Sequence, residues 1–215
     1  MDRIDAYCER LGPEFWAEPV NALTNAAFVV AAALMWRRWP GDPLCRALAA
    51  VLGLIGVGSF LFHTLATPWA AAADTLPILG YILLYVFAAH RRVWGQGVWT
   101  SLLFAALTVP WIALLTPAFE ALPGLDVSSF YWPVPTLILL HAWLLRRRRR
   151  EVARGFALGA GILAISLTFR SLDGAICGAL PLGTHFLWHL LNALMLGWMI
   201  EVLGRASLAT RPVRR

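Results

Sequence analysis

The sequence predicts an all-α integral membrane protein, a single domain over residues 1–215 built as a bundle of seven transmembrane helices. Hydrophobic residues make up 60% of the chain, charged residues only 14%, and the mean hydropathy is +0.67. A soluble chain has about 25% charged residues, so this composition could not cover a surface exposed to water. One membrane-spanning helix needs about 20 apolar residues, so the length suits seven spans with short loops and no additional soluble domain.

Seven apolar segments alternate with turn and charge signals, and helices are expected for all of them because lipid offers the backbone no hydrogen-bond partner. The segments are Val20–Trp36, Leu44–Leu65, Trp69–Ala89, Val98–Thr116, Phe130–Leu145, Gly155–Phe169 and Thr184–Leu203. They are separated by an Arg pair with Pro-Gly-Asp-Pro, a second Arg pair, the stretch from Pro117 to Asp126, the run Arg146–Arg150, and Pro181. The first 18 residues are polar, so no cleavable signal peptide is expected.

The basic residues predict the orientation in the membrane. All 18 are arginine, and 15 of them fall in the loops after the first, third and fifth segments or in the C-terminal tail, against Arg3, Arg10 and Arg170 on the other side. The positive-inside rule therefore places the N-terminus outside and the C-terminus in the cytoplasm. This clustering argues against nucleic-acid binding, which a net charge of +6 would otherwise suggest. The absence of lysine excludes a retinal protein, and the Arg- and Ala-rich composition indicates a bacterial inner membrane.

Five polar side chains fall near one end of three helices, at similar depth in the predicted outer leaflet. They are Ser59, His63, Asp74, His185 and His189. Residues four apart share a helix face, so each helix with two of them presents both on one side. Three histidines and a carboxylate are the composition of a zinc site, where the metal acidifies water and the carboxylate takes its proton. The alternative is that each side chain only hydrogen-bonds a neighbouring helix.

The five residues belong to longer motifs whose combined spacing is specific. The motifs are Ser59-x-x-x-His63, Asp74 eleven residues later, Thr184-His185-Phe-Leu-Trp188-His189, Tyr7-Cys8-Glu9 and Glu18-Pro-Val-Asn21-Ala-Leu-Thr-Asn25. Over nearly the whole chain they resemble the alkaline ceramidases and the wider group of seven-helix membrane hydrolases that includes the progestin and adiponectin receptor family. The two N-terminal motifs are similar to the ceramidase branch in particular.

The resemblance implies a zinc-dependent enzyme that hydrolyses the amide bond of ceramide-like membrane lipids to a fatty acid and a free amine. It implies that His63, His185 and His189 hold the zinc ion. Asp74 would then orient and deprotonate the attacking water, and Ser59 would stabilise the oxyanion of the tetrahedral intermediate. The active site would face the outer, periplasmic leaflet under the predicted orientation.

A calcium site is a further expectation from the resemblance, because eukaryotic alkaline ceramidases bind calcium through an acidic N-terminal segment and the glutamate that starts the first helix. Glu9 and Glu18 match this pattern. The family's acidic position before the aromatic residue is Ala6 here, and Asp5 would have to substitute by a shift in register. The alternative is a solvated acidic terminus.

The three cysteines divide between the two sides of the membrane. Cys8 and Cys177 both fall on the outer side, whereas Cys45 falls in the cytoplasmic loop region, where thiols stay reduced. A disulfide between Cys8 and Cys177 is therefore expected, and the resemblance implies the same link. Two unpaired thiols are the alternative.

Two other functions remain open at this point. One is a lipid-sensing receptor with a structural zinc, although such a zinc needs neither the Asp74 base nor the Ser59 donor. The other is a metal or proton transporter, although transporters distribute polar residues through the full membrane depth. The sequence also leaves open which lipid amide is cleaved and whether the protein forms oligomers.

Overall fold

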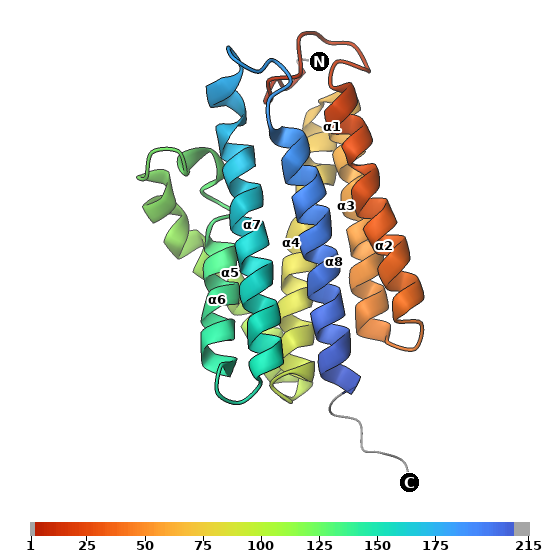
Figure 1. The fold of residues 1–215 in the computed structure, drawn as a ribbon, viewed down its shortest axis with the longest axis vertical. Helices are drawn as coiled ribbons and strands as arrows, with labels where there is room; N and C mark the ends of the chain where they lie inside the picture. Colours follow the sequence, from red (N-terminus) through yellow and green to blue (C-terminus); the bar gives the residue numbers. More distant parts are fainter. Residues whose placement is uncertain (1–2, 209–215) are drawn as a thin grey trace.

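Each of the seven expected apolar segments forms a helix in the computed structural model, which describes residues 3–208 (Figure 1). In that range the protein consists of α-helices and one 3₁₀ turn, without a β-strand. The first segment is divided in two at Asn25. The elements are α1 Pro19–Thr24, α2 Ala26–Arg38, α3 Pro43–Leu65, α4 Pro68–Arg92, α5 Val98–Glu120, η1 Asp126–Ser128, α6 Pro133–Leu145, α7 Arg150–Ile176 and α8 His185–Leu208.

Within residues 3–208, six helices are long and apolar enough to cross a membrane, counting α1 and α2 as one span from Pro19 to Arg38. The protein is therefore an all-helical integral membrane protein. The remaining helix, α6, is apolar but only 13 residues long. At 1.5 Å per residue it extends about 20 Å, less than the roughly 30 Å hydrocarbon core. A seventh crossing by α6 remains a prediction.

Local chemistry accounts for where the helices begin. Four of them start on a proline, whose fixed φ suits the first helical position and whose missing N–H is not needed there. Asp42 caps α3 by accepting hydrogen bonds from the backbone N–H groups of Leu44 and Cys45, each at 3.1 Å. The same carboxylate forms a bidentate pair with Arg92 at 2.7 and 3.0 Å, which joins the start of α3 to the end of α4.

Several helices extend beyond the expected boundaries, and α5 and α7 do so in an informative way. Helix α5 continues through Pro117 to Glu120, because a proline bends a membrane helix without having to end it. Helix α7 continues past Phe169 and includes Arg170 and Asp173. Both of these charged side chains have partners in the folded protein, so a boundary drawn where the apolar run stops falls too early.

Consecutive helices pack side by side from α2 to α8, and α8 closes the bundle against α2 (Figure 1). Helix α8 also contacts α3 and α4, which makes it the most buried span. Two buried tyrosines of α4 hold it in place, because Tyr81 and Tyr85 donate hydrogen bonds to the backbone carbonyls of Leu196 and Met199 at 2.7 and 3.0 Å.

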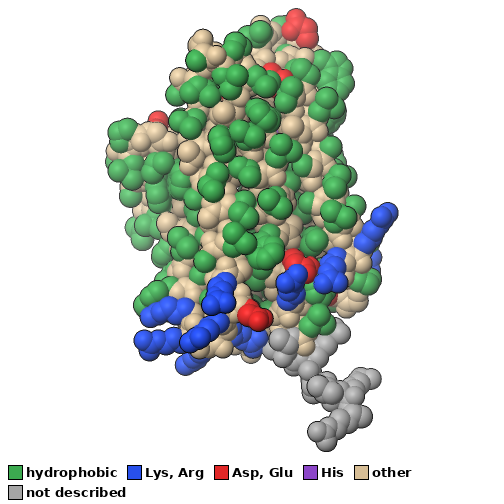
Figure 2. Space-filling model, in the orientation of Figure 1, with side chains coloured by type: hydrophobic (Ala, Val, Ile, Leu, Met, Phe, Trp, Pro, Cys, Tyr) green, Lys and Arg blue, Asp and Glu red, His purple; other side chains and the backbone are tan. Residues whose placement is uncertain are grey.

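The two ends of the bundle differ in charge. Figure 2 shows the arginines gathered at one end of a mostly apolar surface. This is the end where α2 and α4 finish and where α3 and α7 begin. The N-terminal segment and the connection between α7 and α8 lie at the other end (Figure 1). The arginines Arg211, Arg214 and Arg215, which also entered the predicted orientation, lie outside the described residues.

Candidate metal centre

Three histidines meet at the end of the bundle away from the arginine cluster. His63 lies in the last turn of α3, and His185 and His189 lie in the first two turns of α8. They are 0, 2 and 1% exposed, and one ring nitrogen of each lies within 4.8 Å of the others. The distances between ring centroids are 4.6 to 5.1 Å. The three side chains thus form one cluster, as their predicted depth in the membrane indicated.

The hydrogen bonds of the rings determine which nitrogens are free to bind a metal. His63 Nδ1 lies 2.5 Å from a Glu18 carboxylate oxygen, which can only accept, so Nδ1 carries the proton. Thr24 donates its hydroxyl proton to a backbone carbonyl of α1 and accepts from His189 Nδ1 at 2.9 Å. His63 Nε2, His189 Nε2 and His185 Nδ1 are buried without a protein partner. Buried nitrogens with lone pairs and no donor fit a metal ion.

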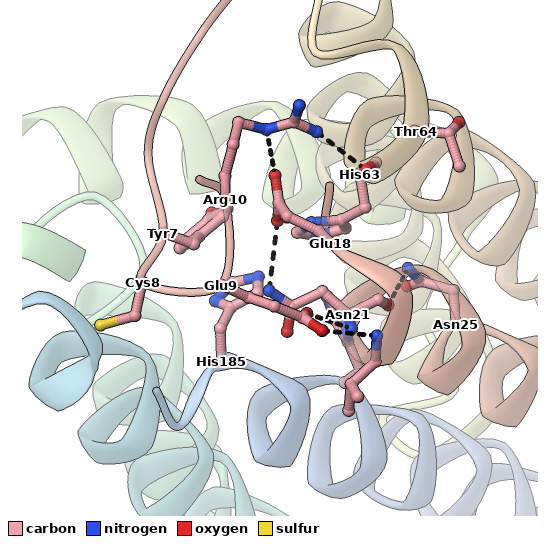
Figure 3. A network of polar contacts seen from close by, with 12 residues as sticks. Tyr7, Cys8, Glu9, Arg10, Glu18, Asn21, Asn25, His63, Thr64 and His185 are labelled. Carbon is pink, nitrogen blue, oxygen red and sulfur yellow. Dashed lines mark hydrogen bonds and ion pairs between the residues drawn. The ribbon is translucent and has the colours of Figure 1, made fainter. Parts of the chain in front are cut away.

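Glu18 is itself held by a second cation. Its other carboxylate oxygen lies 2.5 Å from Arg10 Nε, and both side chains are 2% exposed (Figure 3). Burial opposes the charged form of Glu18, but the hydrogen bond from His63 and the charge of Arg10 outweigh it and hold the pKa of Glu18 below its usual range. The glutamate therefore stays ionised and accepts from His63.

Ser59 and Asp74 lie beside the histidines. Ser59 is buried one turn before His63 on α3, and the carboxylate of Asp74, on α4, lies next to its hydroxyl and within electrostatic range of His63. The two helices approach closely at this point, because a Cβ on Gly58 would overlap the backbone carbonyl of Ala73. A glycine at that position thus allows Asp74 to come close to Ser59 and His63.

The N-terminal segment is tied over the site by a disulfide and a buried aspartate. Cys8 and Cys177 form the expected disulfide, with Cα atoms 5.3 Å apart. The Asp173 carboxylate accepts hydrogen bonds from the backbone N–H groups of Cys8, Thr184 and His185 at 2.9, 2.7 and 2.8 Å. It therefore joins α7, the N-terminal segment and the first turn of α8, which carries two of the histidines.

Tyr7 and Arg170 complete this side of the site. The Tyr7 ring stacks on His185 with a centroid distance of 3.5 Å. Arg170 donates to the Ser128 hydroxyl at 3.0 Å and lies over the rings of Tyr131 and Trp188 at 5.2 and 5.9 Å. A guanidinium is thereby placed within electrostatic range of Asp74 and Tyr7.

The three residues expected to bind calcium have different surroundings. Glu9 accepts from the backbone N–H groups of Val20 and Asn21 at 2.7 and 2.8 Å, one on each carboxylate oxygen. Glu18 pairs with an arginine and a histidine, as described above. Asp5 is exposed. Among the described residues, the groups that converge closely enough to hold a metal ion do not include these carboxylates.

Several residues of the site were not predicted from the sequence. Arg10 and Arg170 were expected only as arginines of the outer side, and no role was predicted for Asp173 or Thr24. A charged residue inside an otherwise apolar helix was the available signal for Arg170 and Asp173, because such residues are expensive in a membrane unless they have partners. Arg10 and Thr24 carry no comparable signal.

A protein-family model described as Ceramidase matches residues 6–210, nearly the whole chain, including the three histidines, Ser59 and Asp74. A search of the curated proteins found no match.

Proposed function

Since the chain belongs to the ceramidase family, we propose that it is a zinc-dependent membrane hydrolase that cleaves the amide bond of ceramide-like N-acyl lipids and releases a fatty acid and a free amine. Family membership makes it an amidohydrolase of lipids. The main support for metal dependence is the convergence of three buried ring nitrogens that have no protein partner, next to a carboxylate.

His63, His185 and His189 would hold the metal. Three neutral imidazoles suit zinc, which accepts nitrogen ligands and in catalytic sites keeps a fourth position for reacting molecules. Bound there, zinc supplies a Lewis acid for the amide carbonyl and acidifies water at neutral pH. Glu18 and Thr24 keep the protons of His63 and His189 on the nitrogens that face away from the metal.

The remaining chemistry is assigned to Asp74 and Ser59. Asp74 takes a proton from the attacking water as its oxygen bonds to the carbonyl carbon. It then gives that proton to the amide nitrogen as the carbon–nitrogen bond breaks, so the amine leaves uncharged. Ser59 would donate a hydrogen bond to the carbonyl oxygen as negative charge develops there and would keep its proton. Removing one such donor typically lowers the rate by about 10²–10³-fold.

An apolar cavity next to the site suits the acyl chain of a lipid. It is lined by residues of α4, α6, α7 and α8, among them Tyr81 and Trp188, and by Tyr131 from the connection before α6. Trp188 lies one turn from His185 on α8, and from there the lining runs along the bundle, although the three histidines are not part of it. An amphiphile could place its chain there while its amide bond lies at the histidines.

The proposal includes a topology. The chain would form one domain with seven crossings, the N-terminus and active site on the outer side and the C-terminus in the cytoplasm of a bacterium, as the arginine-rich end of the bundle supports (Figure 2). Reporter fusions after α5 and after α7 test it, because the two positions are expected on the outer side. A reporter found on the cytoplasmic side in either fusion would contradict the orientation.

The decisive experiment measures products. Purified protein is incubated with ceramide, other N-acyl lipids and a matched lipid ester, and fatty acid and amine are quantified by mass spectrometry with and without a zinc chelator. Chelator-sensitive release of the amine, restored by zinc, is expected. A zinc-loaded protein that releases no product from any lipid would favour a receptor with structural zinc. Zinc or proton flux into liposomes would favour a transporter.

Variants separate binding from chemistry. Substitution of His63, His185 or His189 by alanine is expected to remove most of the zinc, as measured by elemental analysis. Asp74→Asn is expected to retain zinc and lose most hydrolysis, because an amide cannot accept the proton. The control is Asp126→Asn, at an exposed aspartate that accepts one hydrogen bond from Gly124 N. Wild-type turnover by Asp74→Asn would exclude Asp74 as the base.

A further inference from the structure

A buried chain of polar contacts runs from the N-terminal segment to the metal centre. Arg10 pairs with Glu18 at 2.5 Å, and Glu18 accepts from His63 Nδ1 at 2.5 Å (Figure 3). Arg10 also donates from its Nη2 to the backbone carbonyl of His63 at 2.9 Å. Arg10, Glu18 and His63 are 5, 2 and 0% exposed. The guanidinium of Arg10 therefore acts on His63 in two ways. It contacts the backbone carbonyl of His63 directly, and it holds Glu18, which in turn contacts the imidazole.

Calcium does not fit the residues at this position. Calcium takes six to eight oxygen ligands, but both oxygens of Glu9 already accept from backbone N–H groups of α1. One oxygen of Glu18 accepts from Arg10, and the other accepts from His63 and from Asn21 Nδ2 at 3.1 Å. A divalent cation would have to compete with these donors for the carboxylate oxygens and lie beside the charge of Arg10. The expected third ligand, Asp5, is exposed.

We propose that the Arg10 guanidinium takes the place of the expected calcium ion beside Glu18, and that zinc binding here is independent of calcium. Arg10 is then a positioning residue. It neutralises Glu18 and keeps that carboxylate aimed at His63 Nδ1, which leaves His63 Nε2 with its lone pair toward the metal. This inference rests on the proposed function in one respect, that His63 is a zinc ligand.

An arginine is suited to this task. Its guanidinium stays charged at all accessible pH values and presents several N–H groups in a rigid plane, so it can contact a carboxylate and a carbonyl at once. Here Nε binds Glu18, Nη2 binds the carbonyl of His63, and Nη1 binds the carbonyl of Gly12 at 3.2 Å. The cation is part of the chain, so its presence does not depend on the concentration of a free ion.

The first test uses the wild-type protein. Zinc affinity is measured by competition with a chromophoric chelator in calcium-depleted buffer and in millimolar calcium, and calcium binding to zinc-loaded protein is measured by equilibrium dialysis. Equal zinc affinity in both buffers and no bound calcium are expected. Stoichiometric calcium binding that tightens zinc binding would overturn the proposal.

The second test uses variants of Arg10. Arg10→Gln is expected to weaken zinc binding by about 10- to 100-fold, the usual effect of removing a residue that orients a metal ligand. Arg10→Lys, which keeps the charge but not the planar fork, should recover part of this loss. Arg3→Gln is the matched control, because Arg3 is an exposed arginine of the same segment. Zinc affinity of Arg10→Gln equal to that of Arg3→Gln would also overturn the proposal.

Activity distinguishes this inference from the proposed function. At saturating zinc, Arg10→Gln is expected to regain most of its kcat, because Asp74 and Ser59 are unchanged. A wild-type protein that binds zinc without hydrolysing lipids would refute the hydrolase and leave the role of Arg10 intact. The calcium measurement needs no variant, so it decides the matter even if Arg10→Gln does not fold.

Discussion

Asp173 provides the sharpest prediction about how the metal centre is assembled. Its carboxylate is 2% exposed and accepts three backbone hydrogen bonds, from Thr184 just before α8, from His185 at the start of α8 and from Cys8. A negative charge at the N-terminus of a helix is favourable in itself. In Asp173→Asn the side-chain oxygen can still accept from Thr184 and His185, but the amide NH₂ would face the Cys8 N–H, where two donors meet.

The expected loss follows from these contacts. A hydrogen bond to a charged group contributes about 1.5–3 kcal/mol. Asp173→Asn removes one such bond and the charge from two others, so we expect the free energy of unfolding to fall by about 3 kcal/mol. For a chain of this length each kcal/mol lowers Tm by about 2–4 °C, which gives a shift of about 6–12 °C. Zinc affinity should fall as well, because His185 is the first residue of α8.

The assay is thermal unfolding in detergent at a fixed scan rate, together with zinc competition at a temperature where both proteins are folded. Asp126→Asn is the matched control, since Asp126 is also an aspartate but is exposed and accepts a single hydrogen bond. If Asp173→Asn has the same Tm as Asp126→Asn and keeps wild-type zinc affinity, the carboxylate does not hold the first turn of α8 in place.

Two further predictions concern the contact between α3 and α4 and the disulfide. Gly58→Ala should lower stability by about 1–3 kcal/mol, because its Cβ would overlap the Ala73 carbonyl and force α4 outward. It should also reduce hydrolysis more than zinc content, whereas Gly53→Ala on the same helix meets only an ordinary contact and should behave as wild type. Alkylation without reductant should label one cysteine by intact mass, since Cys8 and Cys177 are bonded. Three labelled cysteines would show that the bond is absent in the isolated protein.

The sequence was sufficient to predict the helices and the cluster of histidines. The free energy of placing a segment in lipid depends on that segment's own residues, so an apolar run predicts a helix. Each predicted run does form a helix. The four-residue spacing of Ser59 and His63, and of His185 and His189, is likewise local. Because arginine counts placed the three helix ends at one depth, the sequence by itself predicted that His63 meets the α8 histidines.

The partners of these residues were decided by tertiary structure alone. Arg10 contacts the backbone of a residue 53 positions away, and Asp173 accepts a hydrogen bond from Cys8 across 165 positions. No periodicity or composition relates such positions, because they meet only when α3, α7 and the N-terminal segment pack at the same end of the bundle. The resemblance implied calcium at Glu9 and Glu18, and it could not reveal that the fold gives Glu18 an arginine partner. The hydrophobicity of a local segment is enough to predict a helix. The partner of a buried charge, in contrast, depends on which helices pack against each other.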